Sequence, residues 1–256
     1  MQEKTKNCIV MIQARTDSKR FPKKILSVIE NESMLWHVIN RVKKMKCDEI
    51  VVVTTKRKID DDIIKIAKKQ KIKFFRGKTN DVLDRFYQIS LKLKADVIVR
   101  ITADCPLIDP IESQKVLDFF LKGDYDYISN DNETYPNGLD TECFSFKTLK
   151  KAWEESKLKS EKEHVTPYIW KNPKKFKIGT VENKSKKKMN HLRWSVDYPD
   201  DLDFVKQVYS KLYKKQKIFT MKKILDLLKK DPNLIKINSK YKKNEGYLIS
   251  LEKDLT

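Results

Sequence analysis

A cationic segment directly follows the first apolar run of the chain, and its residue types suit phosphate binding. Residues 8–12 have the continuous apolar character of a buried strand. The residues that follow include Gln13, Arg15, Ser18, Lys19, Arg20, Lys23 and Lys24. Loops at the carboxyl ends of strands in an open α/β sheet face the ligand crevice, where cations can bind phosphates. A solvated basic loop is the alternative, because neither G-x-x-x-x-G-K-[ST] nor G-x-G-x-x-G is present.

Two aspartates follow predicted strands in the same manner. The predicted strand 96–101 continues into T-A-D-C-P, so we expect Asp104 at the carboxyl edge of the sheet. Asp197 leaves the predicted strand 191–196 and is expected to face Asp104 across the crevice. Because a carboxylate beside nucleotide phosphates commonly holds Mg²⁺, the pair predicts a metal site. The alternative for Asp104 is to cap the turn at Pro106.

A polar loop with aromatic residues lies between residues 130 and 146 and suits an acceptor pocket. Its candidate residues are Asn130, Tyr135, Asp140 and Glu142. His164, beside Glu163, can act as a general base or bind a hydroxyl group. For each of these residues a structural role is the alternative, since loops are variable surface and satisfied structural histidines are common.

The elements that must position these residues alternate along the chain. Strands are predicted at 8–12, 49–54, 72–75 and 96–101, with helices at 33–46, 60–69 and 80–93 between them. This alternation predicts a parallel sheet. Further helices are predicted at 110–121, 148–156, 160–170, 200–213 and 221–229, and further strands at 125–129, 176–181 and 191–196.

Length and composition bound the class of protein. The 256 residues allow one large α/β domain or two small ones, and we expect a single domain with a core at about 7–230 and a polar tail at 231–256. No apolar run approaches the ~20 residues that span a bilayer, and the first residues lack a signal-peptide pattern, so a cytoplasmic protein without membrane contact is expected. The four cysteines form no C-x-x-C pair and suggest neither disulfides nor zinc.

The net charge of +20 raises the alternative of a nucleic-acid-binding protein without catalysis. Only eight of the 56 cations are arginines, and the lysines are scattered over predicted helices without interleaved aromatic residues. We therefore expect no nucleic-acid partner.

Six ordered motifs between residues 7 and 213 carry a family resemblance. They are I-Q-A-R-x-x-S-x-R-x-P-x-K-x-L at 12–26, F-R-G with D-V-L-x-R-F at 75–86, R-I-T-x-D-C-P-L-I-D-P at 100–110, Y-P-N-G-L-D at 135–140, E-H-V-T-P-Y at 163–168 and L-R-W-S-V-D-Y-P-D-D-L at 192–202. The chain resembles the cytidylyltransferases of the spore-coat-polysaccharide type, relatives of the 3-deoxy-manno-octulosonate and acylneuraminate enzymes. The resemblance implies an α/β, Rossmann-like nucleotide-diphospho-sugar transferase fold, with a mixed, mostly parallel sheet flanked by helices.

The resemblance also implies the ligands: CTP, Mg²⁺ and a sugar-type acceptor. The expected nucleotide-binding residues are Gln13, Ala14, Arg15, Ser18, Arg20, Lys24, Arg76, Asp81, Arg85, Thr102 and Asp104. Asp104 and Asp197 match the metal-binding aspartates, and the expected acceptor residues are Asn130, Tyr135, Asp140, Glu142, His164 and Trp194. The family usually has glycine where this chain has Asp17 and Lys23, so the backbone there is expected to approach phosphate less closely.

The expected reaction is attack by an acceptor hydroxyl or phosphate on the α-phosphorus of CTP, with release of pyrophosphate. Arg15, Arg20 and Lys24 are the expected catalytic residues, because cations can neutralise charge on the leaving group. A metal-dependent glycosyltransferase of similar fold is the alternative enzyme, although it would usually carry a D-x-D pair. The acceptor stays open, and the tail is expected on the surface or on a second subunit of a homodimer.

Overall fold

One seven-stranded sheet organises the protein. The computed structural model describes residues 6–213, 218–241 and 243–255. The strand order is β5-β4-β1-β6-β8-β7-β9. The strands are β1 (Cys8–Gln13), β4 (Glu49–Thr55), β5 (Lys73–Gly77), β6 (Val97–Thr102), β7 (Tyr127–Ser129), β8 (Glu142–Ser145) and β9 (Ile178–Thr180), and a separate antiparallel pair joins β2 (Val28–Ile29) to β3 (Glu32–Ser33).

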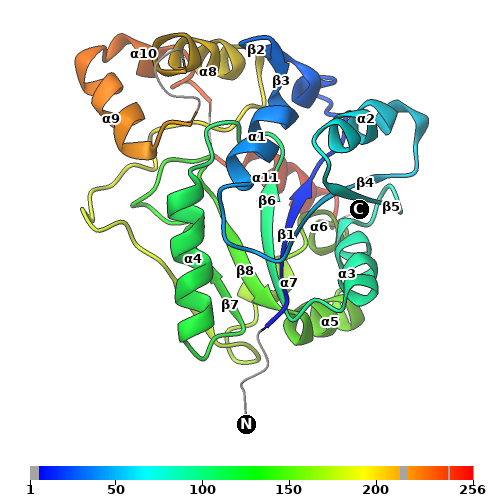
Figure 1. The fold of residues 1–256 in the computed structure, drawn as a ribbon. Coiled ribbons are helices and arrows are strands. Elements are labelled where there is room, and N and C mark those ends of the chain that lie inside the picture. The colour runs from blue at the N-terminus through cyan, green and yellow to red at the C-terminus, as the bar shows by residue number, and fades with distance from the viewer. Residues whose placement is uncertain (1–5, 214–217, 242, 256) are drawn as a thin grey trace.

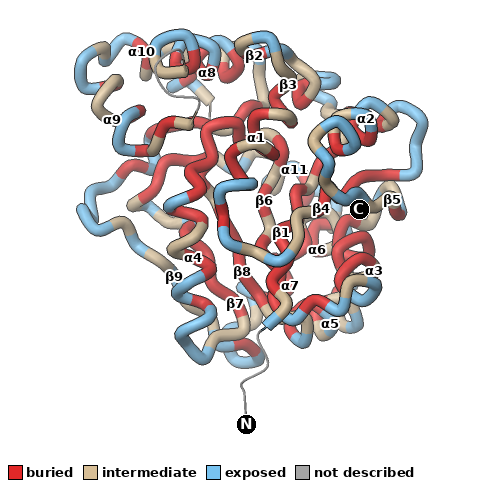
Figure 2. The backbone as a smooth tube through the Cα atoms, in the orientation of Figure 1, coloured by how far each residue is buried: buried red, intermediate tan, exposed pale blue. Residues whose placement is uncertain are grey.

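The centre of the sheet is parallel and buried on both faces. β1 pairs in parallel with β4 and β6, and β5 continues in parallel beyond β4. β8 runs antiparallel to both β6 and β7. Figure 2 shows the central strands as buried tube. Parallel strands are covered on both faces and therefore need nearly continuous apolar runs, which explains the sequence of β1. The predicted mixed, mostly parallel sheet is confirmed.

Helices cover the two faces of the sheet, as Figure 1 shows. On one face α1, α2 and α4 pack their apolar side chains against β1, β4 and β6. On the other face α3, α5 and α7 do the same. The bounds of these helices are α1 (Met34–Val42), α2 (Asp61–Lys69), α3 (Val82–Leu93), α4 (Pro110–Lys122), α5 (Phe146–Glu155) and α7 (Pro167–Trp170).

The remaining helices lie near the carboxyl edge of the sheet or beyond it. α8 and α9 share a third apolar cluster with Tyr135, Leu139 and Trp194. The bounds are α6 (Lys159–His164), α8 (Pro199–Leu212), α9 (Met221–Lys230), α10 (Asn233–Lys236) and α11 (Glu245–Glu252), with short 3-10 turns η1 (Lys24–Leu26) and η2 (Lys58–Asp60).

Two predicted elements differ from the structure. The predicted helix 160–170 is two helices, because Val165 adopts a positive φ of 73° between α6 and α7. The predicted strand 191–196 is wrong, since only an isolated bridge joins Arg193 to Asn137. Its apolar alternation buries Leu192, Trp194 and Val196 in the third cluster, while its backbone bonds to two loops instead of a strand edge.

The C-terminal residues fold onto the chain's own surface. Leu234 joins the third apolar cluster, and the buried Asn238 side chain donates to Asp201 Oδ1 and to the carbonyl of Arg193, both at 2.9 Å. α11 packs against α6. The tail therefore lies beside the loops at the carboxyl edge of the sheet, and contact with a second subunit stays a prediction.

Candidate active site

Lys24 brings the two predicted metal-binding aspartates together. Its ammonium group donates to Asp104 Oδ2 at 2.8 Å, to Asp197 Oδ1 at 2.9 Å and to the carbonyl oxygen of Val196 at 2.6 Å. The Lys24 side chain is only 9% exposed. Three oxygens therefore surround one buried cationic centre.

The loop after β1 is held so that Lys24 points into this centre. The Thr16 backbone N–H and hydroxyl both donate to Asp60 Oδ1, at 2.9 and 2.7 Å. The Lys23 N–H closes the loop on the Thr16 carbonyl at 2.8 Å. Lys23 itself has φ 57°, the left-handed conformation that favours glycine. The geometry thus retains a glycine-type turn although the side chain is lysine.

A second set of cations holds Asp197. Arg20 Nη2 lies 2.7 Å from Asp197 Oδ1, and Arg193 Nη2 donates to Asp197 Oδ2 at 2.9 Å. Arg193 also donates to the fully buried Asp201, which accepts the backbone N–H groups of Asp197 and Tyr198. Asp197 is therefore oriented from both its side chain and its backbone.

The charges of this cluster reinforce one another. Burial opposes ionisation of Asp197, but the Lys24 ammonium and Arg20 guanidinium outweigh it and hold the pKa of Asp197 well below its usual range. Burial also opposes ionisation of Asp104, but the positive charge of Lys24 outweighs burial and lowers the pKa of Asp104. Burial alone would lower the pKa of Lys24, yet the two aspartates raise it. All three groups are consequently ionised at neutral pH.

Gly138 joins two of the sequence motifs. It has φ +101°, and a Cβ there would lie 2.5 Å from the Ser195 backbone nitrogen. The neighbouring Asn137 carbonyl accepts the Trp194 N–H at 2.7 Å, and Val196 N–H donates to the Asp104 carbonyl at 2.8 Å. This close backbone approach carries the chain from Trp194 to Asp197 past Asp104.

Arg15 and Asp17 are paired with partners that the sequence did not indicate. Arg15 Nη2 donates to Glu163 Oε1 at 2.9 Å, and the Arg15 side chain is 39% exposed. Asp17 forms an ion pair with Arg57 and lies 3.6 Å from Arg15 Nε. The negative charge of Asp17 in the predicted phosphate loop is thus matched by two guanidinium groups.

The other predicted nucleotide-binding residues have diverse positions around the carboxyl edge. Ala14 is buried, Ser18 Oγ accepts the Phe21 N–H at 3.4 Å, and Thr102 Oγ1 lies 3.2 Å from Cys105 Sγ. Gln13 Oε1 accepts from Arg100 Nε at 3.1 Å. These residues lie at the ends of β1 and β6 or in the loops that follow them.

Arg76, Asp81 and Arg85 lie around α3 and the end of β5. The Arg76 guanidinium donates hydrogen bonds to the carbonyl oxygens of Thr55 and Arg57 and forms an ion pair with Asp61. Asp81 caps α3 by accepting the Asp84 N–H at 2.8 Å. Arg85 is fully buried; burial, and then the charge of Arg15, lower its pKa to about 10. These contacts give Arg76 and Asp81 structural roles.

Four of the six predicted acceptor residues are in the interior. Trp194 is 0% exposed and Tyr135 is 2% exposed, both within the third apolar cluster. Asn130 is tied to Thr141 and Leu139. Glu142 accepts from Arg100, Tyr127 and Thr166. These four side chains are buried in this structure, and their contact with an acceptor stays a prediction.

Asp140 and His164 are the two remaining acceptor candidates. Asp140 Oδ2 accepts the Gly138 N–H at 3.0 Å, and burial, then the charge of Asp131, raise its pKa to about 7. Burial, followed by the positive charge of Arg100, lowers the pKa of His164 to about 4. Among the described residues His164 Nε2 has no hydrogen-bond partner although the atom is buried. His164 is therefore neutral and available to a ligand.

Sequence reasoning missed Arg193 as a site residue. Arg193 stands four and eight positions before the two aspartates that it holds, Asp197 and Asp201. That spacing within L-R-W-S-V-D-Y-P-D-D could have suggested an ion pair, but only the turn after Val196 brings the side chains into contact. Glu163 forms an ion pair with Arg15. The sequence did not predict this contact, because the only notable feature of Glu163 there is its position beside His164.

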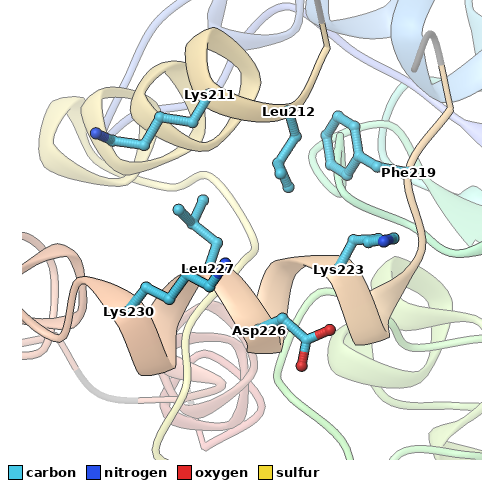
Figure 3. A pocket seen from close by; sticks show the side chains of 7 residues that line it. All are labelled: Lys211, Leu212, Phe219, Lys223, Asp226, Leu227 and Lys230. Atoms are coloured by element: carbon cyan, nitrogen blue, oxygen red, sulfur yellow. The ribbon is translucent and has the colours of Figure 1, made fainter. Parts of the chain in front are cut away.

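A pocket elsewhere on the surface involves none of these residues. It lies between α8 and α9 and is lined by Lys211, Leu212, Phe219, Lys223, Asp226, Leu227 and Lys230 (Figure 3). The lining combines the apolar side chains of Leu212, Phe219 and Leu227 with three lysines and one aspartate. No group of three or more His, Cys, Asp or Glu side chains within the described ranges is arranged to hold a metal ion. None of the helices in those ranges is long and apolar enough to cross a membrane.

A family model of cytidylyltransferases matches residues 9–233, which include every site residue described above. The chain belongs to the cytidylyltransferase family. It is accordingly a CTP-dependent nucleotidyltransferase, and the resemblance seen in the sequence motifs is confirmed.

Two proteins similar to this cytidylyltransferase span nearly its whole length, and a third matches less than half of it. It is 38% identical over 234 residues to an uncharacterized protein of Methanocaldococcus jannaschii, covering 90% of this chain and 94% of the relative. It is 27% identical to the spore coat polysaccharide biosynthesis protein SpsF of Bacillus subtilis, covering 88% and 95%. It is 35% identical over 125 residues to the 8-amino-3,8-dideoxy-manno-octulosonate cytidylyltransferase of Shewanella woodyi, covering 44% and 47%.

Solved structures agree with the fold. A cytidylyltransferase from Leptospira borgpetersenii is 32% identical with a TM-score of 0.85, covering 90% of this chain and 97% of that one. A CMP:2-keto-3-deoxy-manno-octonic acid synthetase complexed with CTP is 15% identical with a TM-score of 0.59, covering 80% and 98%. The second likeness concerns the Rossmann-like fold alone.

Proposed function

We propose that this cytidylyltransferase transfers CMP from CTP to a sugar acid for surface polysaccharide or glycan synthesis, releasing pyrophosphate. The observation that carries the proposal is the cluster of Lys24 and Arg20 on Asp104 and Asp197, at the carboxyl edge of a parallel sheet. In this cluster ionised carboxylates form ion pairs with cationic side chains. A bound triphosphate would attract the cations, and a bound dication would attract the carboxylates.

A sugar acid as acceptor is supported by relatives and by local charge. Two relatives are named for a spore coat polysaccharide and for an amino-dideoxy-octulosonate. Arg15 and Arg100, which pair with Glu163 and Glu142, both act electrostatically on His164. Two guanidinium groups beside a neutral imidazole suit a ligand that carries both a carboxylate and hydroxyl groups.

Asp104 and Asp197 fit a Mg²⁺ ion. The three oxygens around Lys24 Nζ already coordinate one positive centre, and two of them are hard carboxylate oxygens of the kind that Mg²⁺ prefers. When bound, Mg²⁺ would supply Lewis-acid polarisation of a phosphate oxygen. Lys24 would then be released from the carboxylates and become available to phosphate.

The chain's own residues supply charge neutralisation and orientation. Arg20 and Lys24 are placed to receive the negative charge that develops on the leaving pyrophosphate. Arg193 keeps Asp197 in position through its ion pair at 2.9 Å. His164, being neutral near pH 7, can accept the proton of an attacking hydroxyl group.

Pyrophosphate release from CTP, measured with a panel of acceptors, tests the proposal. The panel holds 2-keto-3-deoxy-manno-octonic acid, its 8-amino-3,8-dideoxy analogue, nonulosonic acids and sugar phosphates that lack a carboxylate, each with and without Mg²⁺. We expect release with CTP ahead of ATP, GTP and UTP and only with a sugar acid present. Equal turnover with the sugar phosphates that lack a carboxylate would refute the acceptor class.

Two further parts of the proposal concern partners. Homodimer formation is measured by light scattering of the purified protein. The absence of nucleic-acid binding is measured by titrating random-sequence DNA at two salt concentrations, where a nucleic-acid-binding protein would show a steep loss of affinity with salt.

A further inference from the structure

The C-terminal segment of the chain lies outside the matched family region but beside the active site. The family match ends at residue 233. We call residues 241 and 243–255 the C-terminal cover. It contains α11 and contacts four separate loops or helices at the carboxyl edge of the sheet.

On the phosphate side the cover contacts Tyr198 and Arg20. The Tyr241 ring stacks on the Tyr198 ring at a centroid distance of 4.0 Å, and Tyr198 Oη donates to Glu245 Oε2 at 2.7 Å. Arg20 lies over the same Tyr198 ring. A Cβ added to Gly246 would be 3.5 Å from Arg20 Nη2. The first turn of α11 therefore lies against the guanidinium group that pairs with Asp197.

On the acceptor side the cover reaches the 130–141 loop and α6. Lys243 forms an ion pair with Asp131. Burial lowers the pKa of Lys243, but the negative charges of Asp131 and Asp140 outweigh burial and raise this pKa. Asp254 Oδ1 accepts the Ser160 N–H at 2.9 Å. α11 packs along α6 between these anchors (Figure 1).

Tyr247 and His164 meet where α11 and α6 face each other. Their rings are edge to face with centroids 5.2 Å apart. Tyr247 Oη and His164 Nε2 are both buried, and neither has a hydrogen-bond partner among the described residues. Buried polar atoms are rarely left unpaired, and such a pair commonly marks the place of a ligand. Two unpaired groups on facing elements, one of them in the cover, thus point to a common occupant.

We propose that the C-terminal cover completes the acceptor subsite, with Tyr247 and His164 as the two side chains that bind the acceptor's hydroxyl groups. This inference rests on the proposed sugar-acid transfer. Because the Tyr247 ring lies edge to face against the imidazole of His164, the acceptor enters by displacing Tyr247. Glu245 accepts a hydrogen bond from Tyr198, and Arg20 lies over the Tyr198 ring. The cover therefore contacts both the acceptor side and the phosphate side of the site.

Chemical labelling tests the cover without any acceptor. Diethyl pyrocarbonate modifies neutral imidazoles, and the chain has three histidines, of which His37 is buried and His191 is exposed. Mass spectrometry of the labelled protein should show His164 reacting about tenfold more slowly than His191, and Tyr247→Ala should remove most of that protection. Leu248→Ala, one position along on the exposed face of α11, is the matched control and should leave His164 protected.

Kinetics test the contact with the acceptor. Tyr247→Phe keeps the ring and should raise the acceptor KM about fivefold, the effect of one lost hydrogen bond, with the Kd for CTP unchanged. Tyr87→Phe, in the aromatic stack between α3 and α5, is the matched control. Melting curves of each variant establish that it is folded.

The outcomes separate the two proposals. Wild-type protein that neither binds CTP nor releases pyrophosphate with any acceptor of the panel would overturn the proposed function. The proposed role of the cover would be overturned if wild-type His164 reacted as fast as His191, or if Tyr247→Ala left the protection of His164 unchanged. A Tyr247→Phe variant with the wild-type acceptor KM would overturn the acceptor contact while leaving the proposed function intact.

Discussion

Asp104 and Asp197 accept hydrogen bonds from the same atom, Lys24 Nζ, at 2.8 and 2.9 Å. The two carboxylate oxygens are therefore closer together than the ~8 Å within which one Mg²⁺ can be shared through a bridging water. Asp104 follows β6, while Asp197 follows a loop that the Asn137–Gly138 backbone holds beside it. A cation-binding pair is thus assembled from two motifs far apart in the chain.

Lys24→Met should destabilise the protein while Mg²⁺ restores part of the loss. Removing the ammonium leaves two partly buried carboxylates facing each other, which typically costs about 3 kcal/mol. Urea unfolding with and without Mg²⁺ measures this effect, and Lys19→Met on the exposed part of the same loop is the control. A Lys24→Met protein of wild-type stability would show that the carboxylates do not depend on Lys24.

Asp104→Asn and Asp197→Asn should each remove most activity and raise the Mg²⁺ concentration needed for half-maximal rate. Asparagine keeps the size of the side chain but lacks the charge that a hard dication requires. Since the two groups would act as a unit, the double variant should be little worse than the worse single one. Strictly multiplicative losses in steady-state kinetics would argue for independent roles.

Arg20→Ala should lower kcat about a hundredfold, because one charge-assisted donor to the leaving group contributes about 3 kcal/mol to transition-state stabilisation. The fold should be little affected, since the guanidinium is at the edge of the ion-pair cluster and Lys24 and Arg193 still hold Asp197. Initial rates at saturating CTP measure the loss. An unchanged kcat would reassign Arg20 to holding Tyr198 and the cover.

Gly138→Ala should destabilise the protein strongly and reduce activity with it. The residue has φ +101°, and the new Cβ would lie 2.5 Å from Ser195 N and 2.6 Å from the Trp194 carbonyl carbon. Both neighbours are backbone atoms, so no side chain can move aside to make room. The free energy of unfolding should therefore fall by about 1–3 kcal/mol or more. Thermal unfolding beside Gly246→Ala, where φ is not positive and the nearest atom to the new Cβ would be 3.5 Å away, provides the comparison.

The contribution of Asp140 to stability should fall as pH rises between about 4 and 7, while the buried His164, whose pKa is lowered to about 4, contributes in the opposite direction. Burial and Asp131 raise the pKa of Asp140 to about 7, so the native state holds a proton that the unfolded state has already released in this range. The expected slope for one group is at most about 1.4 kcal/mol per pH unit. Asp140→Asn should reduce this dependence and be more stable than wild type at pH 8. Urea midpoints across pH measure both, and identical profiles would show that Asp140 ionises normally.

The order of strands and helices through β6 could be predicted because each element carries a local signal. β1 and β4 are continuous apolar runs, and Ser33, Asp81 and Asp109 cap their helices as their residue types predict. The position of Asp104 at the carboxyl edge follows from that order. The predicted strand 191–196 failed because apolar alternation also suits a segment that is buried by a loop and a helix.

The sequence by itself determined the sheet and the family, because those depend on periodicity, caps and ordered motifs. Only the tertiary structure decided which polar side chains are available to a ligand. Tyr135, Trp194 and Glu142 have the residue types of an acceptor pocket, yet all three are buried, and Tyr135 and Glu142 hydrogen-bond within the protein. Glu245 and Tyr247 lie in a polar tail without a recognisable motif, and they reach the site only because α11 folds back over Arg20 and His164. Such contacts depend on segments distant in the chain, and no local pattern of residues encodes them.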